Sequence, residues 1–355
     1  MNFIPPLLSN WLRERNATEF PRLAALNYRT RLDNVEQYLG KLVHPEVEKA
    51  ALLNNSGYLN DHGVEHIQTV LERATLLLAS SQASFPQLTA YEVHLLVMAI
   101  HFHDVGNIFG RDQHEANAKR VMDEMSQLVA DEPVERKAIL SIAKAHGGRN
   151  GPSKDTISIL PDTDHILGKI VRFRAIAAIL RFADELADDF HRASHFMARL
   201  KVIPERSQVF HAYSKALQSV LVDPANGLVD LRFNFLRRDA LDKLGKQTGT
   251  DANGKPIIER IYLLDEIYAR TYKMHLEAKY CMRFMNRLTR IDAVTVRIQV
   301  FEDENSIVPC IDEIGYRLNE SGYPEAAESF SNLCPDVKHS GESLKSSLLE
   351  IQSDE

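Results

Sequence analysis

The feature that most constrains the fold is the helical spacing of apolar residues, which recur at intervals of three and four up to about residue 189. In four of these segments, His or Asp continues the apolar stripe where an aliphatic side chain is expected. A carboxylate in such an inward position is costly unless it is paired or bound to a metal. The pattern therefore predicts a helical bundle whose interior encloses a polar site.

Two of the four segments come early in the chain. The segment Val64–Leu78 forms one apolar stripe, with His66 in its first turn. The second segment begins at a capping box at residues 89–92, and its apolar face leads to the adjacent pair His103 and Asp104. Both segments therefore bring a metal-ligating type of side chain to the interior.

The other two segments contribute one residue each. A helix expected from Pro133 carries His146 at its end, where Gly147–Gly148 stops it. A helix expected from about Ile166 to Asp189 places Asp184 on its inner face. Imidazole and carboxylate groups together suit a divalent Mn, Fe, Co, Ni, Zn or Mg ion better than a soft metal.

Beyond about residue 199 the pattern changes to that of an α+β module. Alternating runs predict strands at Val229–Phe235 and Ala293–Val300, with an exposed loop at Asp239–Pro256 and a helix at about Ile261–Leu288 between them. The tail is rich in Ser, Glu, Lys and Asp, which favours disorder. We therefore expect a mainly α protein, an all-helical bundle followed by a smaller α+β module, with divisions at 1–198, 199–333 and 334–355.

The overall composition disfavours several classes of protein. Of the 355 residues 44% are hydrophobic, enough to bury a core, and the net charge of −7 disfavours broad nucleic-acid binding. The three cysteines form no CxxC pair, which fits a reducing cytoplasmic location rather than a disulfide or a thiolate zinc site. Charged residues interrupt the most apolar stretch, so no transmembrane helix is expected.

The order His, His-Asp, His, Asp between positions 66 and 184 resembles the HD domain of metal-dependent phosphohydrolases. The matching segments are HIQTV at 66–70, HFHDVGN at 101–107, AHGG at 145–148 and LRFADEL at 180–186. The segment HGVEH at 62–66 also resembles HD modules of bacterial conflict systems, some of which are attached to HSP90-type ATPases.

This resemblance implies a metal site and a reaction. The implied reaction is hydrolysis of a phosphoester or phosphoanhydride of a cyclic or linear nucleotide by metal-activated water. The implied metal ligands are His66, His103, Asp104 and Asp184. The resemblance further implies that His114 and His146 either bind a second ion or hydrogen-bond the water or the phosphate.

Four further side chains close to these positions are candidates for catalysis or substrate binding: His62, Lys144, Arg149 and Arg181. His62 precedes His66 by one helical turn and could donate a proton. The three basic residues could clamp a phosphate, since Arg makes bidentate contacts with it. The alternative for each is an ordinary solvated surface residue.

Several specific functions are disfavoured, and three others stay open. The chain lacks the His-His and Gly-Tyr-Pro signatures of cyclic-di-GMP phosphodiesterases, the Glu-Asp motif of alarmone hydrolases and the Arg-x-x-His-Ser pattern of deoxynucleotide triphosphohydrolases. A sensor or assembly module with a structural metal, a nuclease acting on single strands and a di-iron oxygenase remain alternatives. We expect the module after residue 200 to shape substrate choice or homo-oligomerisation, and the partner to be a nucleotide or another phosphorylated small molecule.

Overall fold

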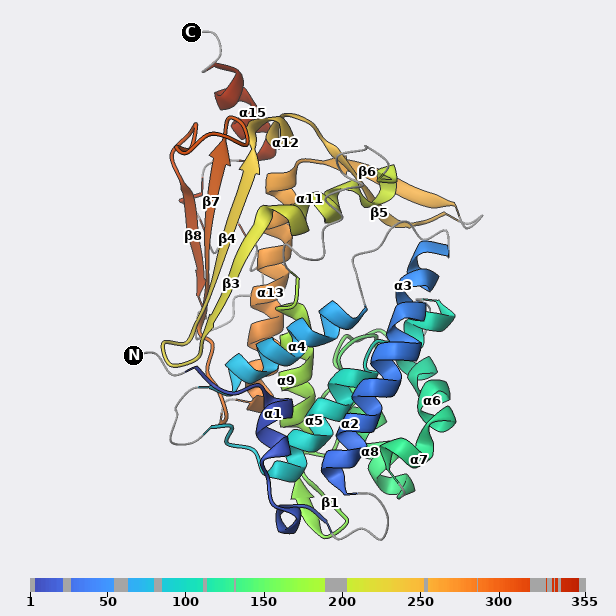
Figure 1. Cartoon of the computed structure of the whole chain (residues 1–355). Coiled ribbons are helices and arrows are strands. Elements are labelled where there is room, and N and C mark those ends of the chain that lie inside the picture. The colour runs from blue at the N-terminus through green and yellow to red at the C-terminus, as the bar shows by residue number, and fades with distance from the viewer. Residues whose placement is uncertain are drawn as a thin grey trace.

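The computed structural model describes residues 4–21, 27–53, 63–79, 85–110, 114–130, 132–188, 203–251, 255–285, 287–319, 330, 334, 336–337 and 340–350. A helical part ends at residue 188, and a mixed part follows from residue 203, so the protein is mainly α with a β-containing part (Figure 1). Among the described helices, none is both long and apolar enough to cross a membrane.

The helical part packs around α5, which is buried along its whole length. Its helices are α1 (Leu8–Arg13), α2 (Tyr28–Tyr38), α3 (His44–Leu53), α4 (Val64–Leu77), α5 (Ala90–Phe102), α6 (His114–Glu124), α7 (Ser126–Val129), α8 (Pro133–Lys144) and α9 (Phe173–Glu185). The predicted capping box at the start of α5 is confirmed, with Thr89 and Glu92 each bonding the other's backbone N–H.

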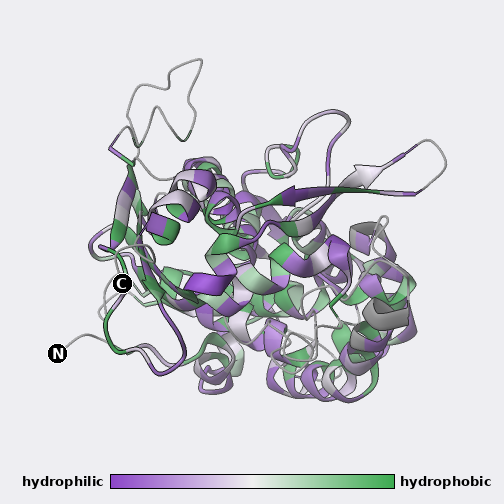
Figure 2. Ribbon diagram, turned by 90° about the horizontal axis from the view of Figure 1, so that it is seen from above, coloured by the Kyte–Doolittle hydropathy of each residue, from purple (hydrophilic) through white to green (hydrophobic). Residues whose placement is uncertain are grey.

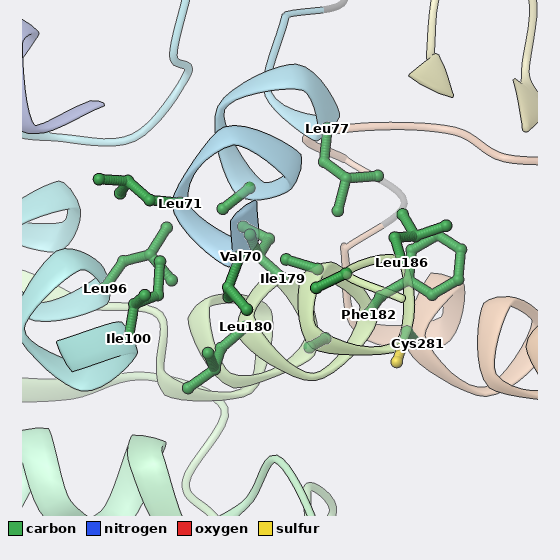
Figure 3. Packing of buried hydrophobic residues seen from close by; sticks show 14 of the residues in the cluster. Val70, Leu71, Leu77, Leu96, Ile100, Ile179, Leu180, Phe182, Leu186 and Cys281 are labelled. Carbon is green, nitrogen blue, oxygen red and sulfur yellow. The ribbon is translucent and has the colours of Figure 1, made fainter. Parts of the chain in front are cut away.

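The core between α4, α5 and α9 consists of interlocking aliphatic and aromatic side chains. Figure 3 shows Val70 of α4 and Ile100 of α5 close to Leu180 of α9. Each of these side chains is buried. This packing fixes the positions of the ends of α4, α5 and α9, where His66, His103 and Asp184 lie.

The fourth predicted helix starts later than its apolar pattern suggests. Residues 164–171 form a hairpin of β1 (Asp164–Ile166) and β2 (Lys169–Val171), and α9 begins only at Phe173. The turn between the strands has positive φ at Leu167 and Gly168, which a helix cannot accommodate. The expectation of a helix from Ile166 was therefore wrong for its first two turns or so, about seven residues.

The later part is built on a four-stranded sheet with the order β3–β4–β7–β8. Its strands are β3 (Leu217–Asp223), β4 (Leu228–Leu236), β7 (Ala293–Phe301) and β8 (Ile314–Asn319). The central pair β4–β7 is parallel and the outer pairs are antiparallel, so the chain must cross over between β4 and β7. The helix α13 (Leu263–Met285) makes this crossover, which confirms the predicted strands and the long helix between them.

Two expectations for the polar segments of this part were wrong. Residues 239–256 are not a single loop: they include the end of α12 (Arg237–Leu241) and the strand β5 (Leu244–Thr250), which pairs with β6 (Pro256–Ile261). Among the described strands none pairs with this hairpin as a third strand, and it projects from the body with many hydrophilic residues (Figure 2). Its strand pattern was therefore obscured in the sequence. The tail contains a helix, α15 (Gly341–Glu350), because Leu344 and Leu348 lie one turn apart and are both buried.

The long helix α13 packs along α9 and joins the two parts of the molecule (Figure 1). Ion pairs between the helices connect Arg181 to Glu277 and Glu185 to Lys273, so the two helices run antiparallel. The shorter helix α11 (Gln208–Ala216) contacts the same side of α13. Helices α11 and α13 therefore stand next to the end of α9 that carries Asp184.

Candidate metal centre

Six His and Asp side chains meet where the ends of five helices come together. The first turn of α4 provides His66, the end of α5 provides His103, and Asp104 follows directly in a tight turn at the start of Val105–Phe109. The remaining three are His114 at the start of α6, His146 after α8 and Asp184 in the last turn of α9. His66 and His103 are almost completely buried, at 1% and 0% exposed.

Four of these side chains form a compact first group. The Nε2 atom of His66 lies 3.3 Å from Nε2 of His103 and 3.2 Å from Oδ1 of Asp184. The Oδ2 atom of Asp104 lies 3.6 Å from His66 Nε2 and 3.5 Å from His103 Nε2. Two ligand atoms bound to one ion at about 2.1 Å are separated by about 3.0–3.4 Å, so these spacings suit a shared ion.

A second group uses the other oxygen of Asp104. Its Oδ1 atom lies 3.4 Å from Nε2 of His114 and 3.7 Å from Nε2 of His146. The two oxygens of one carboxylate therefore face two separate sets of ring nitrogens. Ligand atoms of Asp104, His114 and His146 are close enough to hold an ion of their own.

Hydrogen bonds to the backbone determine which ring nitrogens can bind a metal. Nδ1 of His103 donates to the carbonyl oxygen of Ile100 at 2.7 Å, and Nδ1 of His146 donates to that of Ala143 at 2.6 Å. In each neutral imidazole the lone pair is then on Nε2, which points into the cluster. Lone pairs of nitrogen and carboxylate oxygen thus face one another, an arrangement that requires a cation between them.

A proton takes the place of that cation when no metal is bound. Burial lowers the pKa of His103, but the neighbouring carboxylates of Asp104 and Asp184 outweigh it and raise the pKa to about 9. The pKa of Asp184 lies well below its ordinary value: burial raises it, and the hydrogen bonds from His103 and His66 more than compensate. Proton and metal ion therefore compete for the same atoms. The donor set fits a divalent ion.

The glycine of the His-Asp-Val-Gly segment brings the two groups together. A Cβ atom on Gly106 would lie 1.9 Å from the backbone oxygen of His114, so only glycine allows α6 to approach this turn. That close approach places His114 beside Asp104.

The cluster lies at the floor of a cavity of about 590 Å³, which four of its members line: Asp104, His114, His146 and Asp184. This is a size typical of small-molecule sites. Residues of the later part form much of its wall, namely Phe210 and Tyr213 of α11, Lys246 of β5, and Glu266, Ala269, Arg270, Lys273, Met274 and Glu277 of α13. Helices α11 and α13 and strand β5 thus cover much of the site.

The other predicted substrate-binding residues have different positions. Arg181 lines the cavity, but its guanidinium group already binds both carboxylate oxygens of Glu277 at 2.7 and 2.9 Å. Lys144 and Arg149 are exposed and do not line the cavity. His62 lies outside the residues that the structure describes.

Besides Arg181, four cations that line the cavity were missed in the sequence. They are Lys154, Lys246, Arg270 and Lys273. On α13 the charged residues 266, 270, 273 and 277 follow a helical spacing that is ordinarily a solvated face. Nothing in this spacing distinguishes a cavity wall from a water-exposed surface, because the opposing helix α9 is distant in sequence.

Comparison with known proteins agrees with this site. The HD-CE family model matches residues 56–270, more than half of the chain. The chain belongs to the HD-CE family. The HD-CE match includes all six His and Asp residues of the cluster and continues across the expected division at residue 198 into α13. No curated protein and no solved structure matches the chain.

Proposed function

We propose that this HD-CE protein is a metal-dependent phosphohydrolase that acts on a phosphoester or phosphoanhydride of a nucleotide. The observation that supports it most is the convergence of lone pairs from His66, His103, Asp104 and Asp184 at the floor of a cavity. These four residues would hold the first ion. A divalent ion bound there lowers the pKa of a bound water and offsets negative charge on a phosphoryl oxygen.

The chain itself orients the reacting groups. The carbonyls of Ile100 and Ala143 hold the rings of His103 and His146 so that only Nε2 faces the cluster. Asp104, with one oxygen toward each group, keeps the two sets of nitrogens at a fixed separation. His114 and His146 would hold a second ion or, without one, hydrogen-bond the bound water or the phosphate.

The wall of the cavity supports a small substrate rather than a long nucleic acid. Helices α11 and α13 cover the floor, and the net charge of −7 supplies no excess of cations for an extended phosphate backbone. We propose a cyclic or linear nucleotide. The resemblance of residues 62–66 to HD modules of conflict systems supports a role of this activity in such a system.

The test combines metal analysis with a substrate screen. Protein purified without chelator is expected to contain at least one divalent ion per chain by elemental analysis. Cyclic nucleotides, nucleoside mono- to triphosphates and short oligonucleotides are then assayed, each with Mn, Ni, Co, Fe and Mg. Absence of turnover with any of them at full metal occupancy would contradict hydrolysis and favour a sensor or an oxygenase.

A further inference from the structure

The charged residues of the cavity are nearly balanced. Nine of them lie outside the His and Asp cluster, and we call these nine the charged wall. Five are cations and four are carboxylates: Lys154, Arg181, Lys246, Arg270 and Lys273 against Glu185, Asp188, Glu266 and Glu277. At neutral pH the charged wall therefore has a formal charge of +1, whichever ion the floor holds.

Three ion pairs connect α9 and the residues just after it to α13. Arg181 pairs with Glu277 at 2.7 Å, Glu185 with Lys273 at 2.7 Å, and Asp188 with Arg270 at 2.7 Å. We call this set the ion ladder. The residue numbers in each pair add to the same value, as expected for two antiparallel helices in one register.

The charge order of the ion ladder specifies that register. Along α9 the order is positive, negative, negative, and along α13 the facing order is negative, positive, positive. Sliding one helix by one turn would place the like charges of Arg181 and Lys273 opposite each other. This alternative register is therefore disfavoured. The ion ladder thus fixes the side of α13 that faces the cavity.

Pairing leaves few cations available for a substrate. Three of the five cations belong to the ion ladder, and Lys246 pairs with Glu266 at 2.6 Å. Glu266 also accepts a hydrogen bond from Nε of Arg270 at 2.8 Å. Among the cavity-lining residues that the structure describes, Lys154 is the one cation with no acidic partner.

The backbone around Lys154 is fastened to three elements of the site. Its carbonyl accepts a hydrogen bond from Arg181 at 3.0 Å, and the Thr156 hydroxyl donates to the carbonyl of Ala145 at 2.7 Å. The carboxylate of Asp155 accepts a hydrogen bond from the hydroxyl of Tyr280 on α13 at 2.7 Å. The segment is therefore held to α8, α9 and α13, while the Lys154 side chain lines the cavity and has no acidic partner in the part of the chain that the structure describes.

We propose that the cavity takes a nucleotide with a single phosphoryl group, and that Lys154 contacts its anionic oxygen. The proposal rests on the proposed phosphohydrolase function and narrows its substrate. A second and third phosphate would lie against the carboxylates of the charged wall with one unpaired cation to offset them. The partly exposed ring of Phe210 gives the base an apolar surface on the same cavity.

The first experiment compares nucleotides on the full-length, Mn-loaded protein. Turnover and equilibrium binding are both measured for mono-, di- and triphosphates of the four nucleosides and for their 3′,5′-cyclic monophosphates. A single-phosphate nucleotide is expected to have the highest kcat/KM and the tightest binding. Triphosphates that bind or react equally well would overturn the proposal.

The second experiment changes Lys154 and leaves the ion ladder intact. Lys154→Ala is expected to raise KM for the preferred nucleotide about tenfold, the loss of one charge-assisted hydrogen bond, with kcat little changed. Lys154→Arg should restore most of the affinity. Lys144→Ala, a matched exposed lysine outside the cavity, serves as control. An unchanged KM in a folded, metal-replete Lys154→Ala protein would overturn the proposal.

The third experiment releases one cation from the ion ladder. Glu277→Gln leaves Arg181 without its carboxylate partner and raises the charge of the wall by one. The ratio of triphosphate to monophosphate binding is expected to increase severalfold, and no increase in a folded protein would contradict the role of charge balance. If no nucleotide is hydrolysed while monophosphate binding still depends on Lys154, the proposed hydrolysis is contradicted and the proposed nucleotide-binding site is supported.

Discussion

The floor and the charged wall of the cavity use the same kinds of residue in opposite ways. On the floor, imidazole nitrogens and carboxylate oxygens all present lone pairs toward one another, at 3.2 to 3.7 Å. On the charged wall, almost every carboxylate already has a cation at hydrogen-bonding distance. The floor has electron-pair donors in excess and therefore needs a bound cation. The carboxylates of the charged wall are paired without a ligand, so the wall contributes the shape and the selectivity of the cavity.

The largest expected effect follows from removing the residue that both groups of the floor share. Asp104→Ala should abolish bound metal and lower activity by more than about 100-fold, since even residues that only orient metal ligands change affinity 10–100-fold. Elemental analysis measures the bound metal, and a turnover assay measures the activity. Asp123→Ala removes an exposed carboxylate of α6 and should change neither. A metal-replete, active Asp104→Ala protein would remove Asp104 from the site.

Metal removal and pH distinguish the floor from the wall. Saturating metal should stabilise the fold by about 2.7 kcal/mol at a free concentration 100 times Kd, and a chelator should reverse this. In metal-free protein the folded pKa of His103 is about 9, above its ordinary 6.5. Stability from that proton is fully present below pH 6.5 and is lost as the pH rises through about 9.

Urea unfolding of the metal-free protein measures this loss. The free energy of unfolding should fall across that range by up to roughly 1.4 kcal/mol per pH unit. Metal-loaded protein should show the opposite trend at low pH, where protons displace the ion. The control is His103→Gln, in which the fall at high pH should disappear. A metal-free wild type that is equally stable throughout would show that no such proton is held.

Gly106→Ala tests how the floor is assembled. The added Cβ would come within 1.9 Å of the His114 carbonyl oxygen, so α6 must move away. We expect a loss of about 1–3 kcal/mol, the usual result of overpacking, together with weaker binding of any second ion. Gly40→Ala, where nothing lies within 4 Å of a Cβ, is the control. Unchanged stability and metal content would mean that α6 adjusts freely.

A charge swap tests whether the wall is held by paired charges. Lys273→Glu places two carboxylates together and should cost about 1–2 kcal/mol, and adding Glu185→Lys should recover most of it, as for coupled neighbours. Denaturant unfolding of the wild type, both single variants and the double variant gives the coupling energy. If the effects of the two substitutions on stability were additive, the role of the ion ladder in fixing the register of the two helices would be contradicted.

The smallest effects are expected for the basic residues outside the cavity. Lys144→Ala and Arg149→Ala should each change stability by less than about 0.5 kcal/mol and leave kcat/KM almost unchanged, as for exposed positions. A large loss of activity in either variant would show that substrate extends beyond the cavity and would weaken the distinction between wall and surface.

Local patterns predicted several elements of both parts well because their signals are short-range. The capping box at 89–92, the proline at the start of α8 and the alternation in β4 and β7 each involve neighbours in sequence. Predictions were wrong where a tertiary contact decides. Leu344 and Leu348 of α15 are apolar anchors in a polar tail, and only their burial against the body shows that the tail is helical there.

The sequence by itself determined which residues could meet at the floor, because His and Asp at inward helical positions have few stable alternatives to a metal. Tertiary structure alone decided the wall. Arg181 was expected to be available for phosphate, and the packing of α13 on α9 pairs it with Glu277, 96 positions away. Lys154 remains without such a partner among the described residues. Charged residues have the same helical spacing on a solvated face and on a cavity wall, so only the position of the opposing helix distinguishes them.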